Sequence, residues 1–128
     1  MERWLGRYSE QIYCAMRLVT GATFACHGAQ KLFGAFGSPG AGGNPLMLLA
    51  GVVEFLGGLL TAVGLGTSYA AFLASGEMAV AYFMAHAPNG FLPIVNKGEL
   101  AVVYSFVFLY IASRGSGALS VDSALRRP

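Results

Sequence analysis

Charge is what this sequence has least of. Only 11% of its 128 residues are charged and 55% are hydrophobic, whereas about 25% of residues are charged in typical soluble domains. The formal net charge is +2, and no basic run with interleaved aromatic residues occurs, so nucleic acid is set aside as a partner. The length allows a single domain over residues 1–128. We therefore expect one domain of an integral membrane protein.

Cysteine is also scarce, which limits the redox chemistry of the chain itself. Cys14 and Cys26 lie in one predicted helix, about 18 Å apart, which is too far for a disulfide. No C-x-x-C motif occurs, so we exclude dithiol chemistry and interpret both residues as small buried hydrophobes. A signal-peptide cleavage site is missing as well, because Arg17 interrupts the first apolar stretch and His27 and Lys31 follow it.

Long apolar segments are abundant, and glycine and proline separate four of them. We expect helices at about residues 9–33, 45–65, 69–87 and 97–113. Ser9 and Asn44 are suitable N-cap residues, and Pro45 suits a first helical position. Gly34 is a suitable C′ residue, and Pro88 should end the third helix.

These segments favour membrane spans over a soluble bundle. Helices of about 20 residues match the hydrocarbon core of about 30 Å. A soluble bundle of this size needs polar helix faces, and the second and third segments have almost none. The predicted fold is an all-α integral membrane protein with four transmembrane helices packed as an antiparallel bundle.

Four spans place both termini on one side of the membrane. Five arginines belong to that side and two lysines to the other: Arg3, Arg7, Arg114, Arg126 and Arg127 against Lys31 and Lys97. Because inside loops are rich in Lys and Arg, we expect a multi-pass protein of the cell inner (plasma) membrane with both termini cytoplasmic. The apolar tip at residues 91–95 should lie at the membrane surface or fold back over the helices.

The few ionisable residues inside the predicted spans indicate a site. Glu54 and Glu77 lie deep in apolar segments, His27 and Arg17 interrupt the first segment, and Glu99 opens the fourth. A charge at the bilayer centre costs ~2.5–3.5 kcal/mol on insertion scales, so it normally faces a partner or a water-filled cavity. Most of these residues fall in the outer half of the predicted bundle. We expect a polar cavity there, open toward the outer face.

Candidate site residues follow from this placement. The candidate catalytic residues are Glu54, Glu77, His27 and His86; the candidate cofactor-binding residues are His27, Gln30, Lys31, Tyr82, His86 and Glu99. No metal site is predicted.

Each candidate also has a structural interpretation. Arg17 can pair with Glu77 as a structural ion pair or extend its guanidinium to the inner interface. Glu99 with Asn96 forms an N-x-x-E pattern typical of a capping box. Glu54 can make a buried packing bond, because a small-residue seam of Gly51, Gly58 and Thr61 flanks it. Interior packing explains single histidines and tyrosines.

Four strings together resemble a known family. They are HGAQKLF from His27, EFLGGLLTAVGL from Glu54, GEMAVAYFMAHAPNGFLP from Gly76 and NKGELAVVY from Asn96. In this order and spacing they resemble the DoxX family of small four-helix bacterial membrane proteins. The resemblance runs from about Arg17 to Asp122.

The resemblance implies a membrane subunit of a redox system that interacts with quinone or quinol through the polar intramembrane site. Family-pattern residues include Arg17, His27, Glu54, Glu77 and Glu99. The chain carries no flavin or nucleotide motif, so electrons would come from a partner redox subunit or another cofactor.

Other functions remain open at the level of sequence. His27 and His86 could ligate haem b as a bis-imidazole pair. A small transporter or a non-catalytic membrane scaffold, in either case a candidate homo-oligomer, would also use buried charges. Helices interrupted in the manner of many transporters are not evident in the sequence.

Overall fold

The computed structural model describes residues 3–126, and within this range the protein is helical without β-strands. Four helices are long: α1 (Ser9–Phe33), α2 (Pro45–Val63), α3 (Thr67–Ala81) and α5 (Glu99–Arg114). The shorter segments are η1 (Gly6–Tyr8), η2 (Ala35–Gly37), the π-helix η3 (Tyr82–His86), η4 (Ala87–Asn89), α4 (Pro93–Asn96) and α6 (Val121–Arg126).

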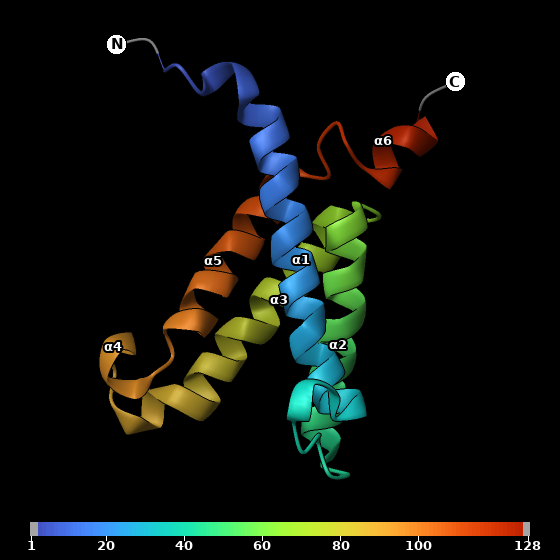
Figure 1. Ribbon diagram of the computed structural model, residues 1–128. Coiled ribbons are helices and arrows are strands. Elements are labelled where there is room, and N and C mark those ends of the chain that lie inside the picture. Colours follow the sequence, from blue (N-terminus) through green and yellow to red (C-terminus); the bar gives the residue numbers. More distant parts are fainter. Residues whose placement is uncertain (1–2, 127–128) are drawn as a thin grey trace.

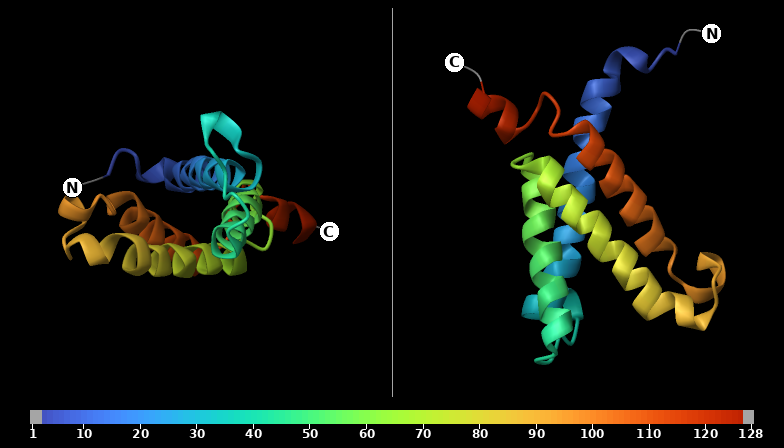
Figure 2. Two further views of the ribbon diagram at one scale, coloured as in Figure 1. Left: turned by 90° about the horizontal axis from the view of Figure 1, so that it is seen from below. Right: turned by 180° about the vertical axis from the view of Figure 1, so that it is seen from behind.

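The long helices form two antiparallel hairpins. One hairpin is α1 with α2, the other is α3 with α5, and the turn at residues 64–66 joins them. Figure 1 and the rear view in Figure 2 show that the hairpins meet near the two termini and diverge toward the opposite end. We call these the terminal end and the loop end; the loop end carries residues 34–44 and α4.

Small residues hold the first hairpin together. A side chain at Gly58 of α2 would place its Cβ 2.5 Å from the backbone nitrogen of Ala25 in α1, and one at Gly21 would meet Ala62 at the same distance. Gly28 likewise contacts the backbone of Phe55. Glycine lets helix backbones approach this closely. The predicted small-residue seam on α2 is therefore a real packing face.

Hydroxyl groups and aromatic rings organise the second hairpin and its junction with the first. The Ser75 hydroxyl of α3 donates to the Ser105 carbonyl of α5 at 2.7 Å, and the Ser105 hydroxyl donates back to the Ser75 carbonyl at 3.1 Å. Phe24 of α1 is fully buried and packs on Phe108 and Tyr104 of α5, with ring centroids 4.6 and 5.2 Å apart. The core lies where α1 meets the hairpin of α3 and α5.

The predicted helix ends are confirmed at three places and wrong at one in the first half of the chain. The Asn44 side chain caps α2 by accepting from Leu46 N and Met47 N, Pro45 is the first helical residue, and Gly34 follows α1 with a φ of 64°. Ser9 is not an N-cap, because η1 precedes it and already supplies helical backbone before α1.

The later boundaries differ because of local backbone geometry. Left-handed Gly64, with a φ of 77°, ends α2 at Val63. The third helix widens into η3 from Tyr82, ahead of Pro88. Pro88 has no backbone N–H to continue the ladder, and its ring would clash with the carbonyl four residues earlier. Left-handed Lys97, with a φ of 63°, delays the fourth helix to Glu99.

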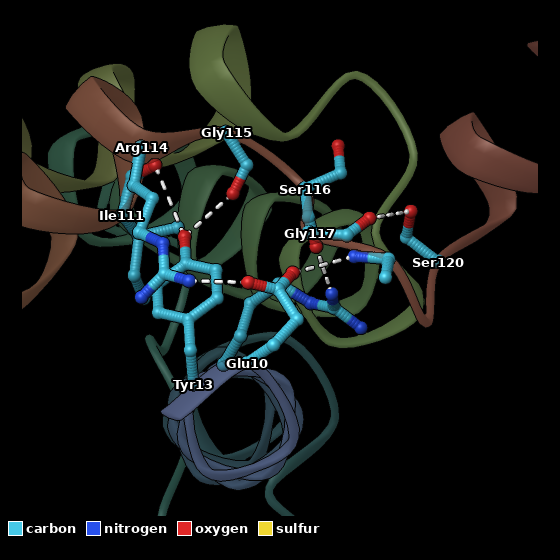
Figure 3. Close-up of polar contacts among 10 residues, drawn as sticks. Glu10, Tyr13, Ile111, Arg114, Gly115, Ser116, Gly117 and Ser120 are labelled. Atoms are coloured by element: carbon cyan, nitrogen blue, oxygen red, sulfur yellow. Dashed lines mark hydrogen bonds and ion pairs between the residues drawn. The ribbon is translucent and has the colours of Figure 1, made fainter. Parts of the chain in front are cut away.

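Polar contacts lock the terminal end. Arg114 of α5 pairs with Glu10 of α1, and the Glu10 carboxylate also accepts from Ala118 N at 2.8 Å (Figure 3). The Tyr13 hydroxyl points at the end of α5, where it donates to the Gly115 carbonyl (Figure 3). The N-terminal part of α1 is thereby fastened to the segment that follows α5.

At the loop end the apolar tip projects outward instead of folding back over the helices. Phe91, Ile94 and Val95 are at least 64% exposed. The loop 34–44 presents exposed Phe36 at the same end. The predicted fold-back over the helices is therefore wrong, and the position of the tip at the membrane surface stays a prediction.

Among residues 3–126, α2 is the one helix that is long and apolar enough to cross a membrane. Its mean hydropathy is 2.1. The helix α5 contains only 16 residues and α3 only 15, since the π-turn and left-handed Lys97 shorten them. The structure thus contains one clear membrane-type helix.

Candidate functional site in the cleft between the hairpins

A cleft of about 930 Å³ lies between the diverging hairpins. All four long helices contribute to it, and its walls are mostly apolar. Leu46, Met47, Leu49 and Val53 of α2 face Phe72, Leu73, Val80 and Met84 of the α3–η3 segment across the cleft, with Phe24 of α1 and Ala101 of α5 completing the walls. Polar groups are few, and each is therefore informative.

Lys31 and Glu54 form an ion pair within the first hairpin. The Lys31 ammonium lies 2.7 Å from Oε1 of Glu54, and the Glu54 side chain is only 2% exposed. Lys31 lies in the last turn of α1, opposite α2. The two helices approach closely at Gly51, where a Cβ would contact Lys31 and Leu32 at 3.0 Å. This close approach fixes the position of Lys31 along α2. The pair satisfies one carboxylate oxygen of Glu54.

Glu77 belongs to the second hairpin and lies near the Lys31–Glu54 ion pair. Its carboxyl interacts electrostatically with Glu54 and with Lys31. Oε2 of Glu54 and Oε2 of Glu77 are buried and accept no hydrogen bond from an N–H or hydroxyl group among the described residues, although either carboxyl can donate to the other when it is protonated. Buried polar atoms are normally hydrogen-bonded. Two orphaned acceptor atoms in one apolar cleft mark its chemically distinct point.

Two histidines also line the cleft. His27 of α1 makes an edge contact with Tyr104, with ring centroids 5.9 Å apart. Nδ1 of His86 lies 3.2 Å from the carbonyl of Asn96. A carbonyl can only accept, so this contact assigns the proton to Nδ1 and leaves Nε2 of a neutral ring as an acceptor.

The structure brings five of the predicted site residues to this cleft: His27, Lys31, Glu54, Glu77 and His86. Gln30, Tyr82 and Glu99 do not line it. Tyr82 instead stabilises the loop end, where its hydroxyl donates to the Phe91 carbonyl and accepts from Asn96 at 3.1 Å. Glu99 is exposed at the start of α5.

The capping box expected at Asn96 and Glu99 is not formed in the predicted way. Asn96 lies in α4, three residues before α5 begins, and its Oδ1 accepts from Gly98 N at 2.8 Å. Its Nδ2 donates to Gly90 O at 2.6 Å. Left-handed Lys97 separates Asn96 from the helix, so Asn96 organises the loop and the first residue of α5 has another N-cap, Gly98.

Arg17 does not pair with Glu77, and this prediction is corrected. The Arg17 side chain is 3% exposed and donates to backbone carbonyls: Thr61 at 3.0 Å, Ala62 at 3.3 Å, Leu119 at 2.9 Å and Ser116. These carbonyls lie at the terminal end. The guanidinium is therefore directed toward the terminal end, where it is buried among backbone carbonyls. Arg127 of the terminal arginine set lies outside the described residues.

Sequence reasoning missed two polar groups of the cleft. Lys97 lines it through the left-handed turn before α5, a conformation that no local pattern around Lys97 announces. The ring of Tyr104 also lines the cleft, while its hydroxyl donates to Thr23 at 3.2 Å. Its position five residues after Glu99, in the NKGELAVVY string, was the available signal.

Comparison with known proteins assigns the chain to a family. A curated protein from Haemophilus influenzae, described as an uncharacterized protein, is 41% identical over 126 residues, covering 93% of this chain and 94% of the relative. No solved structure matches the chain. The DoxX family model matches residues 12–87, which include most of α1, all of α2 and α3, and all five cleft residues that were predicted from the sequence. The chain therefore belongs to the DoxX family, whose members are membrane proteins.

Proposed function

We propose that the protein crosses the membrane four times and binds a quinone or quinol in the cleft, as the membrane subunit of a redox system. The observation that carries the proposal is the pair of orphaned carboxyl oxygens of Glu54 and Glu77 in an apolar cleft. Membership in the family supports the membrane setting.

Exposed apolar side chains support four spans. The 15 residues of α3 and the five of η3 form a continuous helical segment about 30 Å long, which is sufficient for a bilayer core. The outward surfaces of the long helices carry large hydrophobic side chains, among them Leu18, Val19, Leu56, Leu59, Val103, Phe106 and Leu109. Apolar surface of this extent requires a partner, and lipid is the simplest one.

The size and chemistry of the cleft suit an aromatic head group with a hydrocarbon tail. Its volume lies within the range of about 300–1,000 Å³ that is usual for small-molecule sites. The hydroxyl groups of a quinol donate hydrogen bonds, and the free oxygens of Glu54 and Glu77 accept them. The apolar walls and methionines accommodate the tail.

Each polar residue of the cleft has its own role in the proposed binding and proton transfer. Lys31 holds Glu54 in place by their 2.7 Å ion pair, so Oε2 of Glu54 is fixed as an acceptor. Glu77 approaches from the other hairpin and can receive or return a proton beside it. His27 and His86 are further hydrogen-bonding groups for the oxygens of the ring. Electron transfer itself belongs to a partner subunit or another cofactor.

A titration of the purified protein with a short-chain quinone and its quinol, followed by calorimetry, tests this function. We expect saturable binding that Glu54→Gln, Glu77→Gln and His27→Ala each weaken, by about tenfold for a lost hydrogen bond to a charged group. Glu99→Gln is the matched control, because Glu99 has the same side chain and lies outside the cleft. Absence of saturable binding, or equal weakening by Glu99→Gln, would contradict the proposal.

One observation favours haem b as the alternative ligand, since both histidines of the chain line the same cleft. An absorption spectrum of the purified protein distinguishes the two, because a retained haem gives a Soret band.

The exposed tips at the loop end favour a scaffold as the other alternative, because Phe36, Phe91 and Ile94 could contact a partner subunit. If the protein is a scaffold, Glu54→Gln and Glu77→Gln should disturb assembly with the partner subunit, and the protein should not need quinone binding for its function. A small transporter is the remaining candidate of this class, and uptake into proteoliposomes would identify it.

A further inference from the structure

We propose that a second pocket, at the terminal end, binds an anionic phospholipid. This terminal pocket has a volume of about 620 Å³ and lies between the N-terminal segment with α1 and the end of α5. The lining residues on which the argument depends are Arg3, Trp4, Ile12, Met16, Tyr110 and Arg114. It shares no residue with the cleft.

The terminal pocket is layered as a phospholipid is. Arg3, Trp4 and Arg114 lie at its outer rim, before α1 begins and where α5 ends. Tyr110 lies one turn deeper on α5, about 6 Å along the axis, and Met16 lies about two turns into α1. Cationic groups thus occupy head-group depth, and apolar side chains occupy acyl-chain depth.

The charge of the pocket comes from Arg3 and Arg114, of which Arg114 is balanced by its ion pair with Glu10. No acidic side chain lines it among the described residues. Both oxygens of Glu10 are used, one by Arg114 and the other by Ala118 N (Figure 3). The Arg114 guanidinium stacks 4.1 Å over the Tyr13 ring, which fixes it in place, and its contacts with Glu10 and Tyr110 use only part of its five N–H donors.

These features select an anionic lipid over a zwitterionic one. Basic pockets beside membrane helices on one leaflet are typical binding places for acidic head groups. Trp and Tyr favour the interface between lipid and water, and Trp4 is 78% exposed and Tyr110 51% exposed. A free phosphate would leave the apolar wall of Ile12 and Met16 uncovered. The inference rests on the proposed membrane spans but not on quinone binding.

Trp4 offers a direct test, since it is the single tryptophan of the chain. The full-length protein is reconstituted in phosphatidylcholine bilayers that contain a small fraction of phosphatidylglycerol, and either lipid is supplied with brominated acyl chains, which quench tryptophan. We expect brominated phosphatidylglycerol to quench Trp4 more strongly than the same fraction of brominated phosphatidylcholine. Inorganic phosphate should not displace it.

Charge variants separate the pocket from the general surface charge. Arg3→Gln should lower the preference for phosphatidylglycerol about fivefold, the size expected for one arginine near an anionic surface. Arg126→Gln is the matched control, because Arg126 is an exposed arginine at the same end and outside the pocket. Equal quenching by both lipids, competition by phosphate or an equal loss in Arg126→Gln would overturn the inference. Unchanged quinone titration in Arg3→Gln keeps the two proposals distinct.

Discussion

At the scale of single residues, Arg17 has the largest structural consequence. Its buried guanidinium joins three parts of the chain, because its acceptors Thr61 and Ala62 end α2, while Ser116 and Leu119 belong to the segment after α5. A positive charge near the carbonyl end of a helix is stabilised by the helix dipole. Hydrogen bonds to several carbonyls compensate much of the cost of burying the charge.

Arg17→Gln should therefore destabilise the protein strongly. The variant leaves several buried carbonyls without a donor, at a cost of about 1–3 kcal/mol for each group left unsatisfied. Thermal unfolding of the detergent-solubilised protein measures the loss. Arg7→Gln, which removes an exposed arginine of η1, should have a small effect. A similar loss of stability in both variants would show that the positive charge, rather than the hydrogen bonds to the carbonyls, stabilises the protein.

At the scale of elements, the short helix α6 caps the long helix α3. The helix α3 has no side-chain cap from its own N-cap residue Gly66. Asp122 of α6 supplies the acceptors instead, with its carboxylate 3.1 Å from Gly66 N and 3.5 Å from Thr67 N. The Ser116 hydroxyl donates to the same carboxylate. A segment distant in sequence thus completes the start of the helix.

This cap predicts a pH dependence of stability. The hydrogen bond from Ser116, followed by those from Gly66 and Thr67, lowers the pKa of Asp122 below its ordinary value of 3.8. Because the folded state favours the carboxylate, its stabilising contribution is fully present above pH 3.8 and is lost as the pH falls through the lower folded pKa. Asp122 is largely solvated, so the effect should be modest.

The measurement compares the melting temperature of the protein and of Asp122→Asn between pH 7 and pH 3. The difference between them should be largest near neutral pH and shrink in acid. A difference that stays constant down to pH 3 would refute the role of the carboxylate charge.

At the scale of the whole molecule, the two hairpins give the protein two unlike ends. At the terminal end, polar contacts fasten α1, α2 and the segment after α5 together. At the loop end, the hairpins diverge and the cleft lies between them (Figure 1). The first and last described segments, η1 and α6, lie at the same end in Figure 1 and in the rear view of Figure 2. Arg3, Arg7, Arg114 and Arg126 belong to this end, and Lys31 and Lys97 to the other.

The charge difference between the ends predicts the orientation. A C-terminal fluorescent-protein fusion should be bright and a C-terminal alkaline phosphatase fusion inactive, because arginine-rich ends stay in the cytoplasm. Fusions in the loop at residues 34–44 should give the reverse result. Matching reporter activity at both places would contradict the four-span arrangement.

Much of the cleft could be predicted from sequence, because energetic anomalies are visible there. Glu54 and Glu77 stand out in apolar segments, and helical periodicity places Lys31 one turn after His27. The positions of residues near irregular backbone are harder to predict from the sequence. The π-turn directs Tyr82 into the loop end and His86 toward the cleft, and left-handed Lys97 displaces Asn96 from the helix that it was expected to cap.

The helical class, the apolar character, the end of α1 and the start of α2, and the few charged residues inside the helices follow from the sequence, because periodicity and end signals are local properties. Which charges meet depends on the tertiary structure. It paired Glu54 with Lys31, gave Arg17 to backbone carbonyls and brought Glu77 to the Glu54 pair from the other hairpin. Such partners depend on the approach of the helices through Gly21, Gly28 and Gly58 and on the angle between the hairpins, which no local pattern encodes.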